Sequence, residues 1–159
     1  MGTPVTPIEP GAPAPDFEMP TDGGGHVSLA GLKGKTVVLY FYPKADTPGC
    51  TTEAQDFTAL GEAFAQSNAV VIGVSRDATK ALDRFKVKRE LGVTLASDET
   101  GAVTEAFGVW GEKLLYGRTY MGIERATFLI DGSGVVRQVW RKVSVKGHAQ
   151  VVLDVVKAL

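Results

Sequence analysis

The sequence TVVLYFYPKADTPGCTTE, residues 36–53, places the only cysteine of the chain between two expected elements. Its first seven residues are apolar, β-branched or aromatic, which is typical of a buried strand. A loop rich in proline and glycine follows. From Cys50 onward, apolar residues recur at steps of three and four, which predicts a helix over 50–66. The order of strand, tight loop and helix puts Cys50 in the first helical turn.

A sulfur in a first helical turn has a particular electrostatic environment. Backbone N–H groups have no intrahelical partner there, and the helix dipole is positive at that end. Both effects favour the thiolate, which is the reactive form of cysteine. The alternative for Cys50 is an inert buried side chain, the commoner fate of a single cysteine.

Length and composition restrict the class of protein. The 159 residues, of which 44% are hydrophobic, predict one globular domain. A net charge of −1 indicates neither nucleic acid nor an anionic membrane as a partner, and no apolar stretch is as long as a membrane span. With one cysteine and no signal-peptide pattern, the chain is expected in a reducing compartment, the cytoplasm. Prolines crowd the N-terminus, which predicts a flexible segment over 1–13 before a domain over 14–159.

Strands and helices are expected to alternate along the rest of the chain. Residues 16–29 predict a short hairpin, residues 108–122 a loop, and the run DGSG at 131–134 a tight turn between two strands. This order predicts an α/β fold with a central mixed sheet, helices on both faces and an N-terminal hairpin. The other expected elements are strands over 70–75, 95–97, 127–130 and 135–143, and helices over 80–91, 102–107 and 149–159.

Around the cysteine the chain resembles the peroxiredoxins, and more narrowly the peroxiredoxin Q subfamily, also called bacterioferritin comigratory protein. Pro43, Thr47 and Cys50 match the family pattern Pro-x-x-x-Thr-x-x-Cys. The resemblance covers residues 14–159 and implies a thioredoxin-like fold and a thiol-dependent peroxidase. Further similar runs follow in the same order: APDF at 14–17, GVS at 73–75, WGEK at 110–113, YMGIER at 120–125 and KGH at 146–148.

The resemblance assigns a role to each residue of the pattern. Cys50 attacks the peroxide O–O bond and becomes a sulfenic acid. The Thr47 hydroxyl contacts the sulfur or a peroxide oxygen, although a plain helix cap is an alternative for it. Pro43 walls the pocket and shields the sulfur, and it also ends the strand.

Two charged residues complete the set that the resemblance implies. Arg125 supplies a guanidinium that can hold a thiolate and a peroxide oxygen together. From the residues alone, a surface salt bridge is the more frequent role for such an arginine. Glu53 is expected to orient a guanidinium, and on its own it complements the dipole of the predicted helix.

The chain departs from the subfamily because it has no second, resolving cysteine. One common place for that residue is occupied here by Gln55, and another lies near Lys86. An intramolecular disulfide is therefore excluded. The oxidised sulfur must be reduced by an external thiol such as thioredoxin, glutaredoxin or glutathione. The expected protein is a one-cysteine peroxidase, acting on hydrogen peroxide and small organic hydroperoxides.

Two other functional classes compete with this one. A thioredoxin-like redox sensor or binding module would oxidise at Cys50 with little turnover. A cysteine hydrolase would need a histidine base, for which His26 and His148 are the only candidates. Two histidines do not form a metal cluster, and no phosphate-binding loop is present, so neither metal nor cofactor is expected. The resemblance also implies a monomer.

Overall fold

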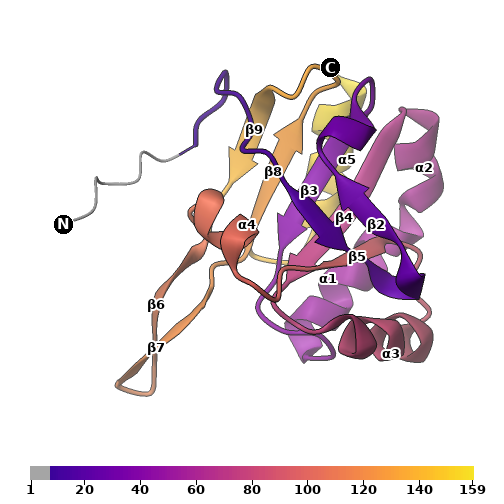
Figure 1. The fold of residues 1–159 in the computed structure, drawn as a ribbon. Helices are drawn as coiled ribbons and strands as arrows, with labels where there is room; N and C mark the ends of the chain where they lie inside the picture. The colour runs from indigo at the N-terminus through magenta and orange to yellow at the C-terminus, as the bar shows by residue number, and fades with distance from the viewer. Residues whose placement is uncertain (1–7) are drawn as a thin grey trace.

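Three parallel strands form one half of the central sheet: β3 (Thr36–Phe41), β4 (Ala69–Ser75) and β5 (Thr94–Ser97). The antiparallel strands β8 (Ala126–Ile130) and β9 (Val136–Trp140) form the other half. The order across the sheet is β5-β4-β3-β8-β9, as Figure 1 shows for the computed structural model, which describes residues 8–159. The predicted mixed sheet is confirmed.

The central strand β3 packs a hydrophobic core on each face. Val38, Tyr40 and Tyr42 belong to one core, and the alternate residues of the same segment belong to the other. This two-residue period is the geometry of a strand buried on both sides. Four helices contribute to the first core: α1 (Pro48–Ala59), α2 (Gly61–Gln66), α3 (Thr79–Arg89) and α5 (His148–Lys157).

The opposite face is covered by smaller elements. Helix α4 (Ala102–Ala106) and the antiparallel hairpin of β1 (Glu18–Pro20) and β2 (His26–Ser28) pack there. Both faces of the sheet therefore carry helical structure, and the predicted N-terminal hairpin is confirmed. None of the helices in residues 8–159 has the length and hydropathy needed to cross a membrane.

Two predicted elements were wrong. The single helix expected over 50–66 is divided at Leu60, whose φ and ψ of −96° and 8° separate α1 from α2. The loop expected over 108–122 contains a second hairpin, formed by β6 (Trp110–Leu115) and β7 (Arg118–Ile123). Its two-residue turn has positive φ at Tyr116 and Gly117, as in a type I′ turn. Tyrosine is unusual at the first position of such a turn, so the sequence does not indicate one here.

The N-terminal segment predicted to be flexible, 1–13, lies partly outside the described residues. Within them, Gly11 donates its N–H to the Val136 carbonyl at 2.7 Å, and Val136 donates back to the Ala12 carbonyl at 2.9 Å. The chain is thus hydrogen-bonded to β9 from Gly11 onward, earlier than the predicted boundary at residue 14.

Candidate active site

The loop between β3 and α1 carries Cys50 into the first turn of the helix. Thr47 precedes the helix with extended backbone angles, φ −99° and ψ 157°. Pro48 occupies the first helical position, where a fixed φ and a missing N–H suit the geometry. Cys50 follows two residues later, and only 2% of it is exposed. The predicted order of strand, loop and helix around the cysteine is confirmed.

Arg125 reaches this turn from the segment between β7 and β8. Its Nη2 donates to Cys50 Sγ at 3.4 Å, and its Nη1 donates to Glu53 Oε1 at 2.6 Å. Glu53 lies three residues after Cys50, so both side chains project from one face of α1. A guanidinium from a distant part of the sequence therefore joins the sulfur to a carboxylate.

Burial controls the charges in this group. Glu53 is 1% exposed, and burial raises its pKa to about 7 even though Arg125 acts in the opposite direction. Burial also opposes the charge of Arg125, but Glu53 and Cys50 outweigh that effect and raise its pKa. Arg125 is therefore a permanent cation beside the sulfur, whereas the charge of Glu53 changes near neutral pH.

Thr47 and Pro43 both belong to the loop between β3 and α1. The Thr47 hydroxyl donates to the Lys44 carbonyl at 2.7 Å. Within residues 8–159 it makes no hydrogen bond to Cys50 and does not cap α1. Its oxygen retains lone pairs that can accept a hydrogen bond from an incoming group. Pro43 is half-buried and lines a cavity of about 440 Å³ together with Trp110.

Asp77 fixes the middle of the catalytic loop, residues 43–47. Its Oδ2 accepts a hydrogen bond from the Ala45 N–H at 2.8 Å and another from Ser75 Oγ at 2.7 Å. The Ser97 hydroxyl donates to the Asp77 carbonyl at 2.6 Å. The loop is thus tied to the ends of β4 and β5, the neighbouring parallel strands.

Asp46 provides a second tie, to the C-terminal end of α3. Its carboxylate oxygens lie 2.7 Å from Lys88 Nζ and 2.9 Å from Arg89 Nη2. Hydrogen bonds from these cations lower the pKa of Asp46. Asp46 itself has a positive φ of 61°. Aspartate tolerates this conformation better than most residues, which allows the sharp bend before Thr47.

Neither histidine is placed to act as a base for the cysteine. His148 is buried, and its Nε2 lies 2.8 Å from Thr127 Oγ1. Burial, assisted by Arg125, lowers the pKa of His148 to about 4, so it is neutral at physiological pH. His26 is on the β1–β2 hairpin, 3.4 Å from Glu18. Across residues 8–159 no cluster of three metal-binding side chains occurs.

The sequence interpretation brought together Cys50, Arg125 and Glu53 but missed the anchors of the loop. Asp77 lies two residues after the predicted strand 70–75, and carboxyl ends of parallel strands meet at one sheet edge. That position was a usable signal. No signal in the sequence predicts the contacts of Asp46 with Lys88 and Arg89, because these contacts depend on where α3 ends relative to the loop.

Comparison with protein families and curated proteins gives a consistent result. The profile of the AhpC/TSA family matches residues 10–139. The protein named peroxiredoxin Bcp from Bacillus subtilis is 50% identical over 150 residues, which is 94% of this chain and 96% of that protein. Peroxiredoxin Bcp from Escherichia coli is 41% identical over 153 residues, covering 96% and 98% of the two chains.

Solved structures show the same similarity. A Xanthomonas campestris peroxiredoxin Q structure superposes with a TM-score of 0.85 at 46% identity, covering 89% of this chain and 90% of the other. Xylella fastidiosa PrxQ gives a TM-score of 0.91 at 37% identity, covering 97% and 98%. The Xanthomonas protein has also been solved as two cysteine-to-serine variants, at two different positions, so it contains at least two cysteines. The chain described here has one.

Proposed function

Since the chain belongs to the AhpC/TSA family, as a one-cysteine peroxiredoxin of the Bcp/PrxQ type and hence a thiol peroxidase, we propose that Cys50 reduces hydrogen peroxide and small organic hydroperoxides and is regenerated by an external thiol. The observation that carries the proposal is the guanidinium of Arg125, 3.4 Å from Cys50 Sγ and 2.6 Å from Glu53. This geometry stabilises negative charge on the sulfur and offers further donors to a peroxide.

The oxidation step transfers one oxygen to the sulfur. The Cys50 thiolate attacks the terminal oxygen of the hydroperoxide, an S–O bond forms and the O–O bond breaks. The departing alkoxide or hydroxide takes a proton and leaves as an alcohol or water, and Cys50 becomes a sulfenic acid. Arg125 holds the sulfur and the oxygen in line, and its donors stabilise the charge on the leaving oxygen.

Thr47 and Pro43 are proposed to serve the same step. The Thr47 oxygen already donates its proton to Lys44, so it faces an incoming peroxide as a hydrogen-bond acceptor. Pro43 has no N–H and forms part of the wall of the adjoining cavity, where it limits access of water to the sulfenic acid. The apolar residues around that cavity support organic as well as inorganic peroxides. Alkyl peroxide reduction is a property of the Xanthomonas campestris relative.

External reduction follows from the single cysteine. A thiol condenses with the sulfenic acid, water leaves, and a mixed disulfide forms at Cys50. A second thiol attacks that disulfide and releases the Cys50 thiol together with the oxidised reductant. We propose that the protein does this as a monomer in the cytoplasm, where thiols are kept reduced.

The test is a measurement of both half-reactions. Reduced protein is mixed with one equivalent of hydrogen peroxide, and its mass is then determined, with Cys50→Ser as the matched control. One added oxygen on the wild-type protein alone is expected, followed by continuous peroxide consumption when a thiol is supplied. Oxidation that stops after one equivalent with every reductant would instead indicate a redox sensor, and an unmodified Cys50 would contradict the proposed chemistry.

A further inference from the structure

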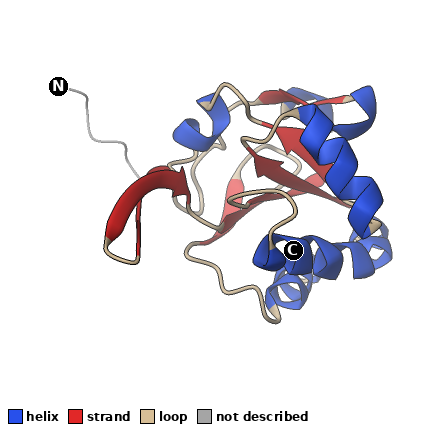
Figure 2. Cartoon of the chain, turned by 90° about the horizontal axis from the view of Figure 1, so that it is seen from below, coloured by secondary structure: helices blue, strands red, loops and turns tan. Residues whose placement is uncertain are grey.

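The β6–β7 hairpin projects away from the rest of the molecule (Figures 1 and 2). Its two strands pair in continuous register from Trp110 opposite Ile123 to Leu115 opposite Arg118. The two strands form a separate two-stranded sheet that is not part of the central one. Beyond its base, the hairpin is therefore stabilised mainly by the hydrogen bonds between its own two strands.

Large apolar side chains gather on this ribbon instead of being buried. Leu114 is 72% exposed, Tyr116 96% and Met121 51%. By the strand register, Leu114 and Met121 lie on one face of the ribbon and Leu115 and Tyr120 on the other. Exposed apolar groups gathered on one projecting element indicate an interaction site. We call these residues the hairpin surface, and its members are Leu114, Leu115, Tyr116, Tyr120 and Met121.

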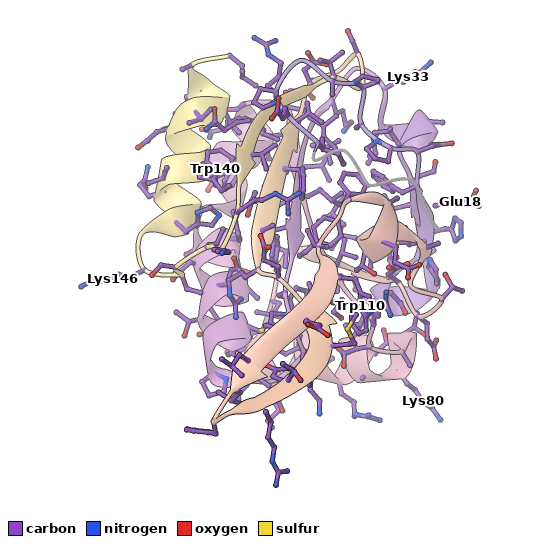
Figure 3. The ribbon with its side chains drawn as sticks, turned by 90° about the vertical axis from the view of Figure 1, so that its left-hand side faces the viewer. Glu18, Lys33, Lys80, Trp110, Trp140 and Lys146 are labelled. Carbon is purple, nitrogen blue, oxygen red and sulfur yellow. The ribbon has the colours of Figure 1, made fainter. Side chains whose placement is uncertain are left out.

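The hairpin surface borders the loop that precedes Cys50. Met121 and Tyr120 line the 440 Å³ cavity, and Pro43 and Lys44 of the catalytic loop line it as well. Trp110 lies at the base of the ribbon, as Figure 3 shows, and also borders the cavity. A molecule seated on the ribbon would therefore be in contact with the loop that leads into α1 and Cys50.

The base of the hairpin is fixed where it meets this cavity. The guanidinium of Arg76 lies over the Trp110 ring, 3.4 Å from its centroid. Arg76 Nε in turn donates to Thr104 Oγ1 at 2.9 Å, which joins the tryptophan to α4. A cation in this position stabilises the ring face and holds it in place. The ribbon thus presents its apolar residues from a defined base.

We propose that the hairpin surface is the docking site for a protein dithiol reductant with an apolar, acidic surface around its reactive cysteine. The proposal rests on the proposed function, because a single cysteine must receive two reducing thiols from outside the chain. A small thiol needs only access to the sulfur and gains nothing from the exposed apolar groups of the ribbon. A protein gains binding energy by burying them.

The charges near the ribbon indicate the acidic character of that partner. Lys44 and Arg118 are exposed, and Lys113 lines the cavity, where its Nζ donates to the Ile123 carbonyl at 2.9 Å. Glu112 is the one acidic residue of the two strands, and Asp77 is the one acidic residue of the cavity lining. Such a surplus of positive charge accelerates encounter with an acidic surface and weakens with salt.

The chemistry of the docked complex balances with two thiols of one partner. The first partner thiol attacks the Cys50 sulfenic acid, an S–S bond forms, and the sulfenic oxygen leaves as water. The second partner thiol attacks the partner sulfur of this mixed disulfide, and Cys50 departs as a thiolate that takes up the proton. The partner is oxidised to a disulfide, and Cys50 is reduced.

The test compares protein and small-molecule reductants in a double variant. Leu114→Ser with Leu115→Ser removes apolar groups at hairpin positions that are 72% and 52% exposed and lie outside the cavity lining. Val87→Ser with Val151→Ser is the matched control on α3 and α5, where the valines are 79% and 48% exposed. Turnover is measured with thioredoxin, its reductase and NADPH, with glutaredoxin and glutathione, and with dithiothreitol. We expect kcat/KM for the protein reductant to fall about five- to ten-fold in the hairpin variant only. Peroxide oxidation of Cys50 and recycling by dithiothreitol should stay within about two-fold.

A charge variant provides an independent test of the docking proposal. Arg118→Glu should lower kcat/KM for the protein reductant at low ionic strength, and the difference should shrink at high salt. Unchanged recycling by both protein reductants in both variants would overturn the proposal. A concentration-dependent dimer that the double variant abolishes would identify a second copy as the occupant and also overturn it. Failure of wild-type Cys50 to take up one oxygen would instead defeat the proposed function, and the docking proposal with it.

Discussion

The catalytic loop and the β6–β7 hairpin border one cavity but are held in different ways. The loop is tied to β4 and β5 through Asp77 and to α3 through Asp46, and Cys50, which follows it in α1, is 2% exposed. The hairpin is fixed at its base through Trp110 and carries exposed apolar side chains beyond it. Chemistry at a thiolate needs a fixed geometry, whereas recognition of a second protein needs accessible surface.

The two regions also differ in their ionisable groups. The region around the loop contains Glu53 and His148, which are buried and have shifted pKa values, and the hairpin contains no buried ionisable side chain among the described residues. Changes of pH should therefore act on the stability of the region around the loop. Between about pH 4.5 and 6.5, Glu53 and His148 have opposite effects in the wild-type protein, so variants are needed to separate them.

The largest expected effect is that of Glu53→Gln on the pH dependence of stability. This variant leaves His148, whose pKa is lowered from 6.5 to about 4. Between these values the unfolded chain binds more protons than the folded protein, so stability should fall by about 3 kcal/mol as pH decreases. Urea unfolding across this range measures it, with Glu112→Gln on the hairpin as the control. A flat profile would show that His148 is not buried in the neutral form.

The converse variant, His148→Gln, should reverse the slope. It leaves Glu53, whose pKa is raised from 4.5 to about 7. The folded protein then binds more protons than the unfolded chain between these values, so stability should fall as pH increases, by up to about 3 kcal/mol. The same unfolding series measures it. A stability that rises with pH would indicate that Arg125, not burial, dominates the ionisation of Glu53.

A smaller effect is expected when the anchor of the loop is removed. Asp77→Ala leaves the Ala45 N–H without its acceptor and should slow peroxide oxidation of Cys50 by about ten-fold, equivalent to about 1.4 kcal/mol. Asp77→Asn retains an acceptor oxygen and should recover most of the rate. Stopped-flow kinetics at several peroxide concentrations would show this. Equal rates in the two variants would argue against a positioning role for the Asp77 carboxylate.

The smallest effect is expected on the hairpin. Leu115→Ser, at a position that is 52% exposed, should change the free energy of unfolding by less than about 0.5 kcal/mol and leave peroxide oxidation unchanged. Urea unfolding and the same kinetics measure both quantities. A clear loss of stability would mean that the ribbon packs on the body of the protein more than its exposure indicates.

The same two regions show what the sequence could and could not predict. The strand, loop and helix around Cys50 were predictable because a buried strand and a helix have distinct apolar periods. The placement of Arg125 came from family resemblance, since 75 residues separate it from Cys50. The hairpin was missed because its residues are exposed and glycines interrupt their alternation, so no buried face produces a pattern. The anchor contacts of Asp46 depend on tertiary placement alone.

The central claim is that Arg125 and Cys50 act as one unit, and a rate measurement tests it most directly. Peroxide oxidation of Cys50 is followed in the wild type, in Arg125→Ala and in Arg125→Lys, with Arg137→Ala as the control because Arg137 pairs with Asp131 on the surface. The account predicts a loss of at least about ten-fold in Arg125→Ala, a partial loss with lysine and no change in the control. An Arg125→Ala protein that oxidises at the wild-type rate would contradict it.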